Sequence, residues 1–296
     1  MPPAVFADTP HRSAEVRIGP RRIPAVARRT DGGWPDGPRS LLLRRRRRRR
    51  RLVPAVALGA MSLGVAGLLV LLPTVSDACQ PDPGAPTVSA SEAASAIAAG
   101  SDVLIVGDSY TTGRGSYDGM HGWAQDLVAE RGWDATIDGV PGSGYVNTGR
   151  SHSSARTYIA RIERHASLDP ELVIVQGSQN DWLVDAATLE SRVEQTLRTA
   201  ERQWPDAVVV AIGPSAPQPR AKTTVAISAA VAAGARDARV PFIDAIDRQW
   251  FTSANSASYA AGDGQHLNDD GYRYLADKID GALEELTRAA PSERCS

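Results

Sequence analysis

A serine that follows a short apolar run is the first residue in this sequence that could do chemistry. Val103 to Val106 are four consecutive apolar residues rich in β-branched side chains, and Gly107-Asp108-Ser109 breaks the run with turn-forming types. A serine placed where a strand of an open α/β sheet ends lies in the crevice where such folds bind ligands. Ser109 is therefore a candidate nucleophile, although a serine here also suits the cap of a turn or a helix.

A histidine and an aspartate near the end of the chain are the candidate partners of this serine. They lie in Asp263-Gly264-Gln265-His266, a polar segment just before the last predicted helix. The imidazole can accept the serine proton, and the carboxylate of Asp263 can accept the other ring N–H and orient the ring. No pair of histidines has metal-ligand spacing, so we expect no metal site and no cofactor. The other four histidines are His11, in the N-terminal leader, and three that lack a comparably placed aspartate, His121, His152 and His165.

Two further loops offer hydrogen-bond donors for an oxyanion. Residues 139–144 contain three glycines, whose bare backbone N–H groups can face a ligand, and residues 176–181 present the side-chain amide of Asn180. Acyl transfer needs such donors, aimed where negative charge develops. Each loop alone also fits ordinary turn chemistry. Together, a serine, a glycine, an asparagine and an Asp-x-x-His in this order favour nucleophilic catalysis.

Alternating strands and helices are predicted to position these residues. The strands are expected at Val103–Val106, Ala135–Ile137, Leu172–Val175, Ala207–Ile212 and Val240–Ile243. The helices are expected at Asp118–Arg131, Ser154–Ala166, Ala186–Gln203, Lys222–Ala238 and Asn268–Arg288. Such alternation predicts an α/β domain over residues 101–290, with a mostly parallel five-stranded sheet covered by helices on both faces.

The set of motifs resembles the SGNH hydrolases, also called GDSL-type esterases and lipases. The resemblance covers about residues 101–288. Gly142 matches the glycine of the family's second block. The other blocks are matched by Gly107-Asp108-Ser109-Tyr110, by Gly177-Ser178-Gln179-Asn180-Asp181, and by Asp263 with His266.

This resemblance implies a flavodoxin-like three-layer α/β/α sandwich and hydrolysis of carboxylic esters. It implies a catalytic set of Ser109, His266 and Asp263, and an oxyanion hole formed by the Ser109 and Gly142 N–H groups and the Asn180 amide. Two residues depart from the family pattern. Tyr110 stands where leucine is common, so we expect a different pocket wall, and Ser178 stands where glycine is frequent, so we expect a slightly different loop around Asn180.

The substrate is expected to be a small-molecule or glycan ester. Three aromatic residues near the motif loops are candidates for a substrate wall, namely Tyr110, Tyr145 and Trp182. Two alternatives remain open from the sequence. One is a non-catalytic carbohydrate-binding module on the same fold, and the other is an O-acyltransferase that acts on cell-envelope glycans with the same residues.

Charge divides the chain into two unlike parts. Residues 1–51 hold 15 arginines against 4 acidic residues, a balance of +11, whereas residues 52–296 hold 18 basic and 30 acidic residues, a balance of −12. Arg44 to Arg51 are eight consecutive arginines directly before an apolar stretch. By the positive-inside rule this favours a role in membrane topology over nucleic-acid binding. We expect residues 1–51 to be a disordered cytoplasmic leader with no nucleic-acid partner.

The apolar stretch that follows is long enough to cross a membrane. Leu52 to Leu72 has no charged residue over 21 positions, and a helix of this length spans roughly 30 Å. We expect residues 52–75 to form a transmembrane signal anchor that contacts the membrane through residues 52–72. A cleaved signal peptide is the alternative, although its apolar region is usually about 7 to 15 residues. Either outcome places the domain outside the cytoplasm, anchored at the cell membrane or secreted.

The remaining segments are a linker and a short tail. Residues 76–100 are rich in Pro, Ala and Ser and are expected to be a linker, with a short helix within residues 89–99. Residues 291–296 form the tail. Cys79 and Cys295, the two cysteines of the chain, could form a disulfide between the two ends of the exported domain, with unpaired thiols as the alternative. The oligomeric state is not indicated.

Overall fold

Five strands form one sheet in which every neighbouring pair is parallel. The computed structural model describes residues 85–288. The strand order is β2-β1-β3-β4-β5, which confirms the prediction of a five-stranded, mostly parallel sheet. The strands are β1 (Asp102–Gly107), β2 (Asp134–Gly139), β3 (Leu172–Gln176), β4 (Val208–Ile212) and β5 (Phe242–Ile243).

The strand order reverses direction at β1, which lies between β2 and β3. Flavodoxin-like sheets bind ligands at this kind of switch point, beyond the carboxyl ends of the strands. Gly107 pairs with Gly139 of β2, and Val106 pairs with Val175 of β3. The carboxyl ends of β1, β2 and β3 are therefore aligned at one edge of the sheet.

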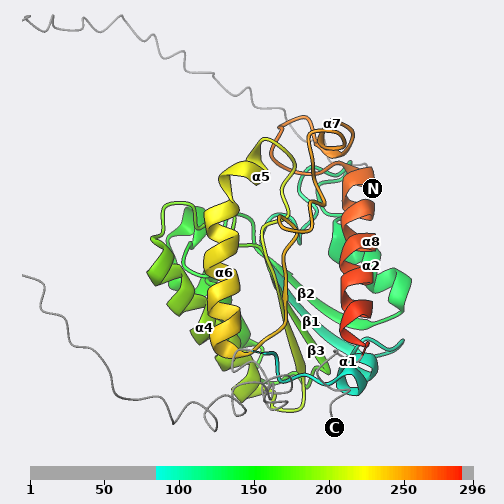
Figure 1. Cartoon of the computed structure of the whole chain (residues 1–296), viewed down its shortest axis with the longest axis vertical. Coiled ribbons are helices and arrows are strands. Elements are labelled where there is room, and N and C mark those ends of the chain that lie inside the picture. Colours follow the sequence, from blue (N-terminus) through cyan, green and yellow to red (C-terminus); the bar gives the residue numbers. More distant parts are fainter. Residues whose placement is uncertain (1–84, 289–296) are drawn as a thin grey trace, which may run out of the picture. The chain divides into compact units, whose positions relative to one another are not determined.

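Helices cover both faces of the sheet and make three layers (Figure 1). On one face lie α1 (Ala90–Ala96), α2 (Trp123–Arg131) and α8 (Asp269–Leu286), and on the other lie α3 (Tyr158–Arg164), α4 (Ala186–Gln203) and α6 (Val225–Ala238). Two short helices, α5 (Arg220–Thr223) and α7 (Ser256–Tyr259), lie at the opposite end of the domain from α1 (Figure 1).

The central strands are buried on both faces because their side chains alternate between two cores. Val103 and Ile105 of β1 pack with α2 and α8, whereas Leu104 and Val106 pack with α3, α4 and α6. Successive side chains of a strand point to opposite faces. This double burial explains why the strands are continuous apolar runs rather than alternating patterns.

One predicted helix begins later than expected. Residues 118–131 were expected to be helical throughout, but α2 begins only at Trp123. Gly119 takes a φ of +71°, outside the helical region. The Asp118 carboxylate accepts the backbone N–H groups of Met120 and His121 at 2.9 and 3.0 Å. Such side-chain bonds to the backbone compete with a helix and favour a turn.

Two further helices and one strand are shorter than predicted. Within residues 154–166, only α3 is α-helical, preceded by a 3-10 turn at Ser154–Arg156. The helix predicted over residues 222–238 is interrupted at Thr224, whose hydroxyl donates to the Ala221 carbonyl at 2.9 Å. The last strand begins at Phe242 rather than Val240, because Pro241 has no N–H to donate to a neighbour.

Several predicted segments lie outside the described residues. They are the leader at 1–51, the membrane segment at 52–75, residues 76–84 of the linker, the tail at 291–296, and the pair Cys79 and Cys295. Within residues 85–288, no helix combines the length and the apolar character that a membrane crossing requires.

The contact between α4 and α6 depends on a glycine. A Cβ at Gly234 of α6 would lie 2.5 Å from the Glu190 carbonyl oxygen and 2.7 Å from the Val193 Cβ of α4. The nearest atom belongs to the backbone of a long helix, which cannot move aside locally. In contrast, a Cβ at Gly281 of α8 would meet nothing within 4 Å.

We expect opposite effects from the same substitution at these two glycines. Gly234→Ala should lower the free energy of unfolding by about 2 kcal/mol through overpacking. Gly281→Ala should raise it by up to about 1 kcal/mol, because alanine favours a helix over glycine. Urea unfolding of the two variants and the parent measures both effects. An equal effect of both substitutions would contradict the close α4–α6 contact.

Candidate active site

A cavity of about 870 Å³ opens where β1, β2 and β3 end. Its walls come from the loops that follow these three strands, from α5 and from the segment before α8. Cavities of this volume hold small-molecule ligands. The lining residues are Ser109, Tyr110, Arg114, Pro141, Gly142, Asn147, Gly149, Arg150, His152, Arg156, Gln179, Asn180, Arg220, Asp263, Gln265 and His266.

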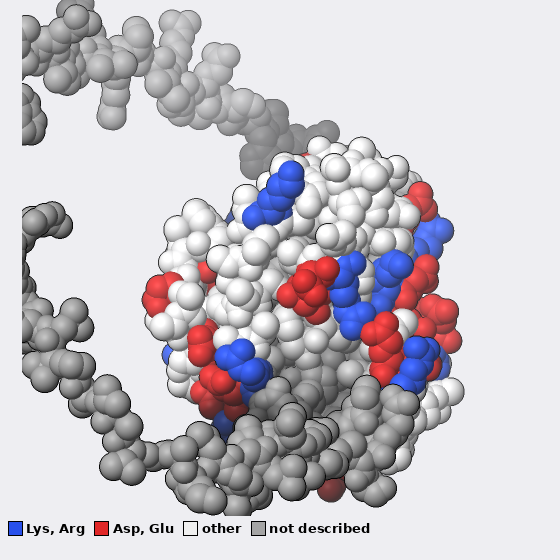
Figure 2. All heavy atoms as spheres, viewed as in Figure 1, with Lys and Arg blue, Asp and Glu red and all other residues white. Residues whose placement is uncertain are grey.

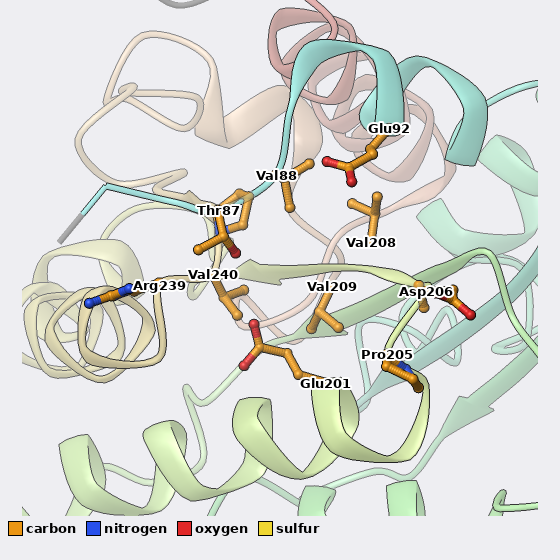
Figure 3. A pocket seen from close by; sticks show the side chains of 12 residues that line it. Thr87, Val88, Glu92, Glu201, Pro205, Asp206, Val208, Val209, Arg239 and Val240 are labelled. Carbon is orange, nitrogen blue, oxygen red and sulfur yellow. The ribbon is translucent and has the colours of Figure 1, made fainter. Parts of the chain in front are cut away.

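A smaller cavity of about 220 Å³ lies at the other edge of the sheet (Figure 3). It is bounded by Thr87 and Val88 from the segment before α1, by Glu201 of α4, and by Val208 and Val240 near the amino ends of β4 and β5. No serine or histidine is among the described residues that line it. The larger cavity is therefore the candidate active site.

Ser109, His266 and Asp263 form a continuous chain of hydrogen bonds in the larger cavity. The Ser109 Oγ lies 2.9 Å from His266 Nε2, and His266 Nδ1 lies 2.6 Å from Asp263 Oδ2. Ser109 is 6% exposed, so its hydroxyl is largely shielded from water. The geometry suits proton transfer from the hydroxyl to the imidazole, with the carboxylate orienting the ring.

Asp263 is held in its ionised form. Partial burial raises the pKa of Asp263, but hydrogen bonds from the backbone and ring of His266 and from the Gln265 N–H outweigh burial and lower the pKa to about 2. The two backbone bonds go to Oδ1, at 2.9 Å each. The carboxylate therefore stays charged at neutral pH, and this stabilisation is lost only as the pH falls through about 2.

The segment that carries the imidazole is a closed turn. Ala260 and Leu267 form an antiparallel bridge, and the Ala261 N–H donates to the His266 carbonyl at 2.8 Å. Gly264 takes a φ of +64°, which lets the chain reverse between these two sides. The turn places both polar side chains on the cavity from one short loop.

Tyr110 fixes this turn to the loop that carries the serine. Its hydroxyl donates to the Gln265 carbonyl, and its ring centroid lies 5.5 Å from that of His266. The side chain is 1% exposed, and burial raises the pKa of the phenol well above its ordinary value, so the group remains a donor. Tyr110, which stands where leucine is common in the family, therefore supports His266 and also lines the cavity.

Two backbone N–H groups in the cavity wall are available to a ligand. Those of Ser109 and Gly142 donate no hydrogen bond within residues 85–288. Gly142 has a φ of +79°, and a Cβ there would lie 3.3 Å from the Gly149 Cα. Gly144, in the same loop, uses its N–H for the Asn147 carbonyl at 2.9 Å and does not line the cavity. Of these two glycines, Gly142 is therefore the one whose N–H can donate to a ligand in the cavity.

The Asn180 amide lies at the same wall but is engaged. Its Nδ2 donates to the Ser143 carbonyl at 2.9 Å and to Asp108 Oδ2 at 3.2 Å. The second bond is long for an N–H···O contact. Asn180 is therefore oriented by two partners, of which Asp108 is the weaker.

Asp181 connects the loop after β2 to the loop after β3. Its carboxylate accepts the backbone N–H groups of Tyr145, Val146 and Asn147 at 3.0, 3.1 and 2.7 Å, and the hydroxyl of Ser178 at 2.9 Å. Burial raises the pKa of Asp181, against the opposing effect of these donors. Ser178 takes a φ of +82°, a conformation that favours glycine, and its bond to Asp181 stabilises the loop in that conformation.

Asp108 is a buried carboxyl group next to the nucleophile. Burial raises the pKa of Asp108 to about 7, although the Tyr110 N–H and the charges of Arg161 and Arg220 act to lower it. Arg161 is itself fully buried and donates to the Gly107 carbonyl at 2.8 Å. A carboxyl group with this pKa changes charge in the neutral range.

Two of the three residues predicted for the aromatic wall do not line the cavity. Tyr145 is fully buried and packs edge-on against Tyr158, with centroids 4.8 Å apart, because its backbone N–H is bound by Asp181. It does not line the cavity. Trp182 is 66% exposed but is not among the lining residues either. Of the three predicted residues, only Tyr110 lines the cavity.

Several lining residues were not anticipated from the sequence. They are four arginines and a buried glutamine, Arg114, Arg150, Arg156, Arg220 and Gln179. The one feature of the sequence that could have indicated them is their place in the segments after predicted strands. Arg220 lies outside every motif. Within residues 85–288, no group of three or more His, Cys, Asp or Glu residues is arranged to hold a metal ion.

Comparisons with known proteins show which family the chain belongs to. A family model described as the GDSL-like lipase/acylhydrolase family matches residues 105–274, more than half of the chain. The GDSL lipase Rv0518 of Mycobacterium tuberculosis is 32% identical over 187 residues, which cover 60% of this chain and 79% of that protein.

Solved structures of low sequence identity share the fold. A carbohydrate esterase family 2 enzyme with a carbohydrate-binding domain from Myceliophthora fergusii has a TM-score of 0.50 at 14% identity, over 64% of this chain and 67% of that one. An active-site mutant of a family two carbohydrate esterase from Clostridium thermocellum has a TM-score of 0.50 at 12% identity, over 64% of each chain. These likenesses concern the architecture alone.

We expect Asp108 to make stability depend on pH. Its folded-state pKa of about 7 lies above the value of 3.8 for the free side chain. Between these values the folded chain holds one more proton than the unfolded chain, so stability falls as the pH rises. This contribution should amount to up to about 3 kcal/mol between pH 5 and pH 8, and Asp108→Asn should remove it.

Urea unfolding at both pH values measures the difference between the parent and this variant. Asp277→Asn, on the exposed side of α8, serves as the control for loss of one carboxyl group. If the parent and Asp108→Asn lose the same stability between pH 5 and pH 8, the buried carboxyl group is not protonated in the folded protein.

Proposed function

The chain belongs to the GDSL-like lipase/acylhydrolase family, and from this premise we propose that it hydrolyses carboxylic esters through an acyl-enzyme intermediate on Ser109. The observation that carries this proposal is the 2.9 Å contact between Ser109 Oγ and His266 Nε2. This contact lies in a cavity whose wall holds two backbone N–H groups without an acceptor among residues 85–288. A carbohydrate-binding module would need no such arrangement.

Acylation begins at the serine hydroxyl. His266 Nε2 takes the proton of Ser109 as Oγ bonds to the carbonyl carbon of the ester, and the carbonyl oxygen becomes an oxyanion. Asp263 stabilises the imidazolium through the 2.6 Å bond to Nδ1. The tetrahedral intermediate then expels the alcohol, which takes its proton from Nε2.

Three donors hold the oxyanion in this proposal. The N–H groups of Ser109 and Gly142 need no rearrangement, because neither is engaged within the described residues. Asn180 contributes its side-chain N–H by giving up the longer contact, 3.2 Å, with Asp108, while the bond to the Ser143 carbonyl keeps the amide in place. Rigid donors of this kind provide a large share of the rate enhancement.

Deacylation repeats these steps with a water molecule in place of the serine hydroxyl. The imidazole removes a proton from a water molecule, whose oxygen attacks the acyl carbon. The second tetrahedral intermediate breaks its bond to Ser109 Oγ and releases the acid, and Oγ regains the proton from the ring. The enzyme returns to its starting state with no cofactor consumed.

Loss of the nucleophile should nearly abolish turnover. Ser109→Ala is expected to lower kcat on a short p-nitrophenyl ester by about 10⁴-fold or more. Asn180→Ala is expected to lower it by about 10² to 10³, the usual effect of one oxyanion donor. A fluorophosphonate probe should label the parent and Asn180→Ala but leave Ser109→Ala unlabelled.

Ser191→Ala, an exposed serine on α4, is the matched control and should behave as the parent does. Full turnover by Ser109→Ala would refute the acyl-enzyme mechanism. Labelling at a serine other than Ser109 would refute the assignment of the nucleophile.

We further propose that the domain works outside the cytoplasm, held by the segment at residues 52–75. The arginines at 44–51 and the 21 uncharged residues that follow support this placement. In cells that express the full chain, external protease should degrade the domain, and the activity should stay with membranes after an alkaline wash. N-terminal sequencing of the mature protein tests the secreted alternative, and a domain protected inside the cytoplasm would contradict both.

A further inference from the structure

The walls of the active-site cavity are cationic. Four arginine side chains and two histidines, His152 and His266, line it, whereas Asp263, bound to His266, is the one carboxylate among its lining residues. Tyr110 and Pro141 are its apolar lining residues, and no Ala, Val, Leu, Ile or Met of residues 85–288 lines it. Such walls suit a charged ligand better than a long acyl chain. The arginines are Arg114, Arg150, Arg156 and Arg220.

The charge of the cavity is opposite to that of the domain around it. Residues 85–288 hold 17 lysines and arginines against 27 aspartates and glutamates, a balance of −10. On the side of α8, basic and acidic side chains lie beside one another (Figure 2). Arg273 forms an ion pair with Asp270, and Arg248 forms one with Glu285. None of the four cavity arginines has a carboxylate partner within the described residues.

Two of these arginines are held in place by neutral oxygen atoms. Arg156 donates to the Thr148 carbonyl at 2.9 Å and to the Pro141 carbonyl at 3.2 Å. Arg220 donates to Gln265 Oε1 at 3.1 Å. Bonds of this kind orient a guanidinium group without neutralising its charge. The positive charges are therefore fixed in the wall before a ligand arrives.

The other two arginines and a glutamine have unused hydrogen-bonding groups. The side chains of Arg114 and Arg150 are exposed and make no hydrogen bond or ion pair within residues 85–288. Gln179 is 1% exposed, and neither polar atom of its amide has a partner among the described residues. A buried amide without a partner is unfavourable. A ligand oxygen at this wall would accept a hydrogen bond from Gln179 Nε2.

We propose that the active site takes an anionic ester, in which a carboxylate or phosphate group lies near the scissile bond and is held by these arginines. Guanidinium groups match the geometry of both anions and form bidentate hydrogen bonds with them. The inference rests on the proposed function, since it assigns a substrate class to the same serine.

Neutral esters and their anionic counterparts, matched in the reacting group, test this proposal. For charge on the alcohol, 4-acetoxybenzoate and 4-acetoxyphenyl phosphate are compared with methyl 4-acetoxybenzoate. For charge on the acyl group, mono(4-nitrophenyl) glutarate is compared with 4-nitrophenyl valerate. Each kcat/KM is divided by the hydroxide-catalysed rate of the same ester, which removes differences in intrinsic reactivity.

We expect the anionic member of at least one pair to be favoured by about tenfold, the effect of one charge-assisted hydrogen bond. The preference should appear mainly in KM and should decrease at high salt, which screens exposed charges. The ratio between the carboxylate and the phosphate shows which anion fits better. Equal or better hydrolysis of the neutral ester in both pairs would overturn the proposal.

A double variant locates the preference. Arg114→Gln with Arg150→Gln should reduce the ratio of anionic to neutral kcat/KM by about three- to tenfold, since partly exposed charge pairs are individually weak. Arg192→Gln, an exposed arginine of α4 that also lacks an ion pair within the described residues, should leave the ratio unchanged. An unchanged ratio in the double variant would refute the assignment to these arginines.

A binding measurement separates this proposal from the proposed mechanism. On Ser109→Ala, calorimetry compares 4-acetamidobenzoate, an unreactive amide, with its methyl ester. Tighter binding of the anion supports the cationic subsite even if the nucleophile has been assigned wrongly. Ser109-dependent turnover with no preference for the anion in binding or in kcat/KM would leave the mechanism standing and refute the substrate class.

Discussion

One buried carboxylate determines the relative position of the two loops that face Ser109 across the cavity. Asp181, at the end of the loop after β3, accepts three consecutive backbone N–H groups from the loop after β2. A Cβ at Gly144 would lie within 2.6 Å of this carboxylate, so the two loops meet at backbone distance. Gly142 and Asn180 are thereby part of one rigid unit. Preorganised donors are effective because they need not reorganise as charge develops.

The electrostatic character of the site is set locally and not by the domain as a whole. The cavity concentrates arginines on a chain segment of net negative charge, and neutral carbonyl and amide oxygens hold Arg156 and Arg220. Carboxylate partners would have fixed these side chains equally well but would have cancelled their charge. Low-dielectric walls of one sign focus the field into a cleft and raise the local concentration of an oppositely charged ligand.

Features that depend on residues close together in the sequence were the ones predicted best. The central strands are doubly buried and therefore uniformly apolar, and Asp263 and His266 lie three residues apart in one turn, so both were recognisable. The start of α2 was missed because Asp118 and Gly119 form a turn that resembles a helix entry. Tyr145 was misplaced because a distant carboxylate directs its backbone inward. No motif marks Arg220, which reaches the cavity from α5, in the segment that follows β4.

The first described residues join the domain far from its reactive groups. The Thr87 N–H donates to the Arg239 carbonyl at 3.2 Å, beside the cavity shown in Figure 3. The strands between that edge and the nucleophile are five or six residues long, a separation of roughly 17–20 Å. The segment before residue 85 is therefore attached to the domain at the end of the sheet opposite the candidate active site.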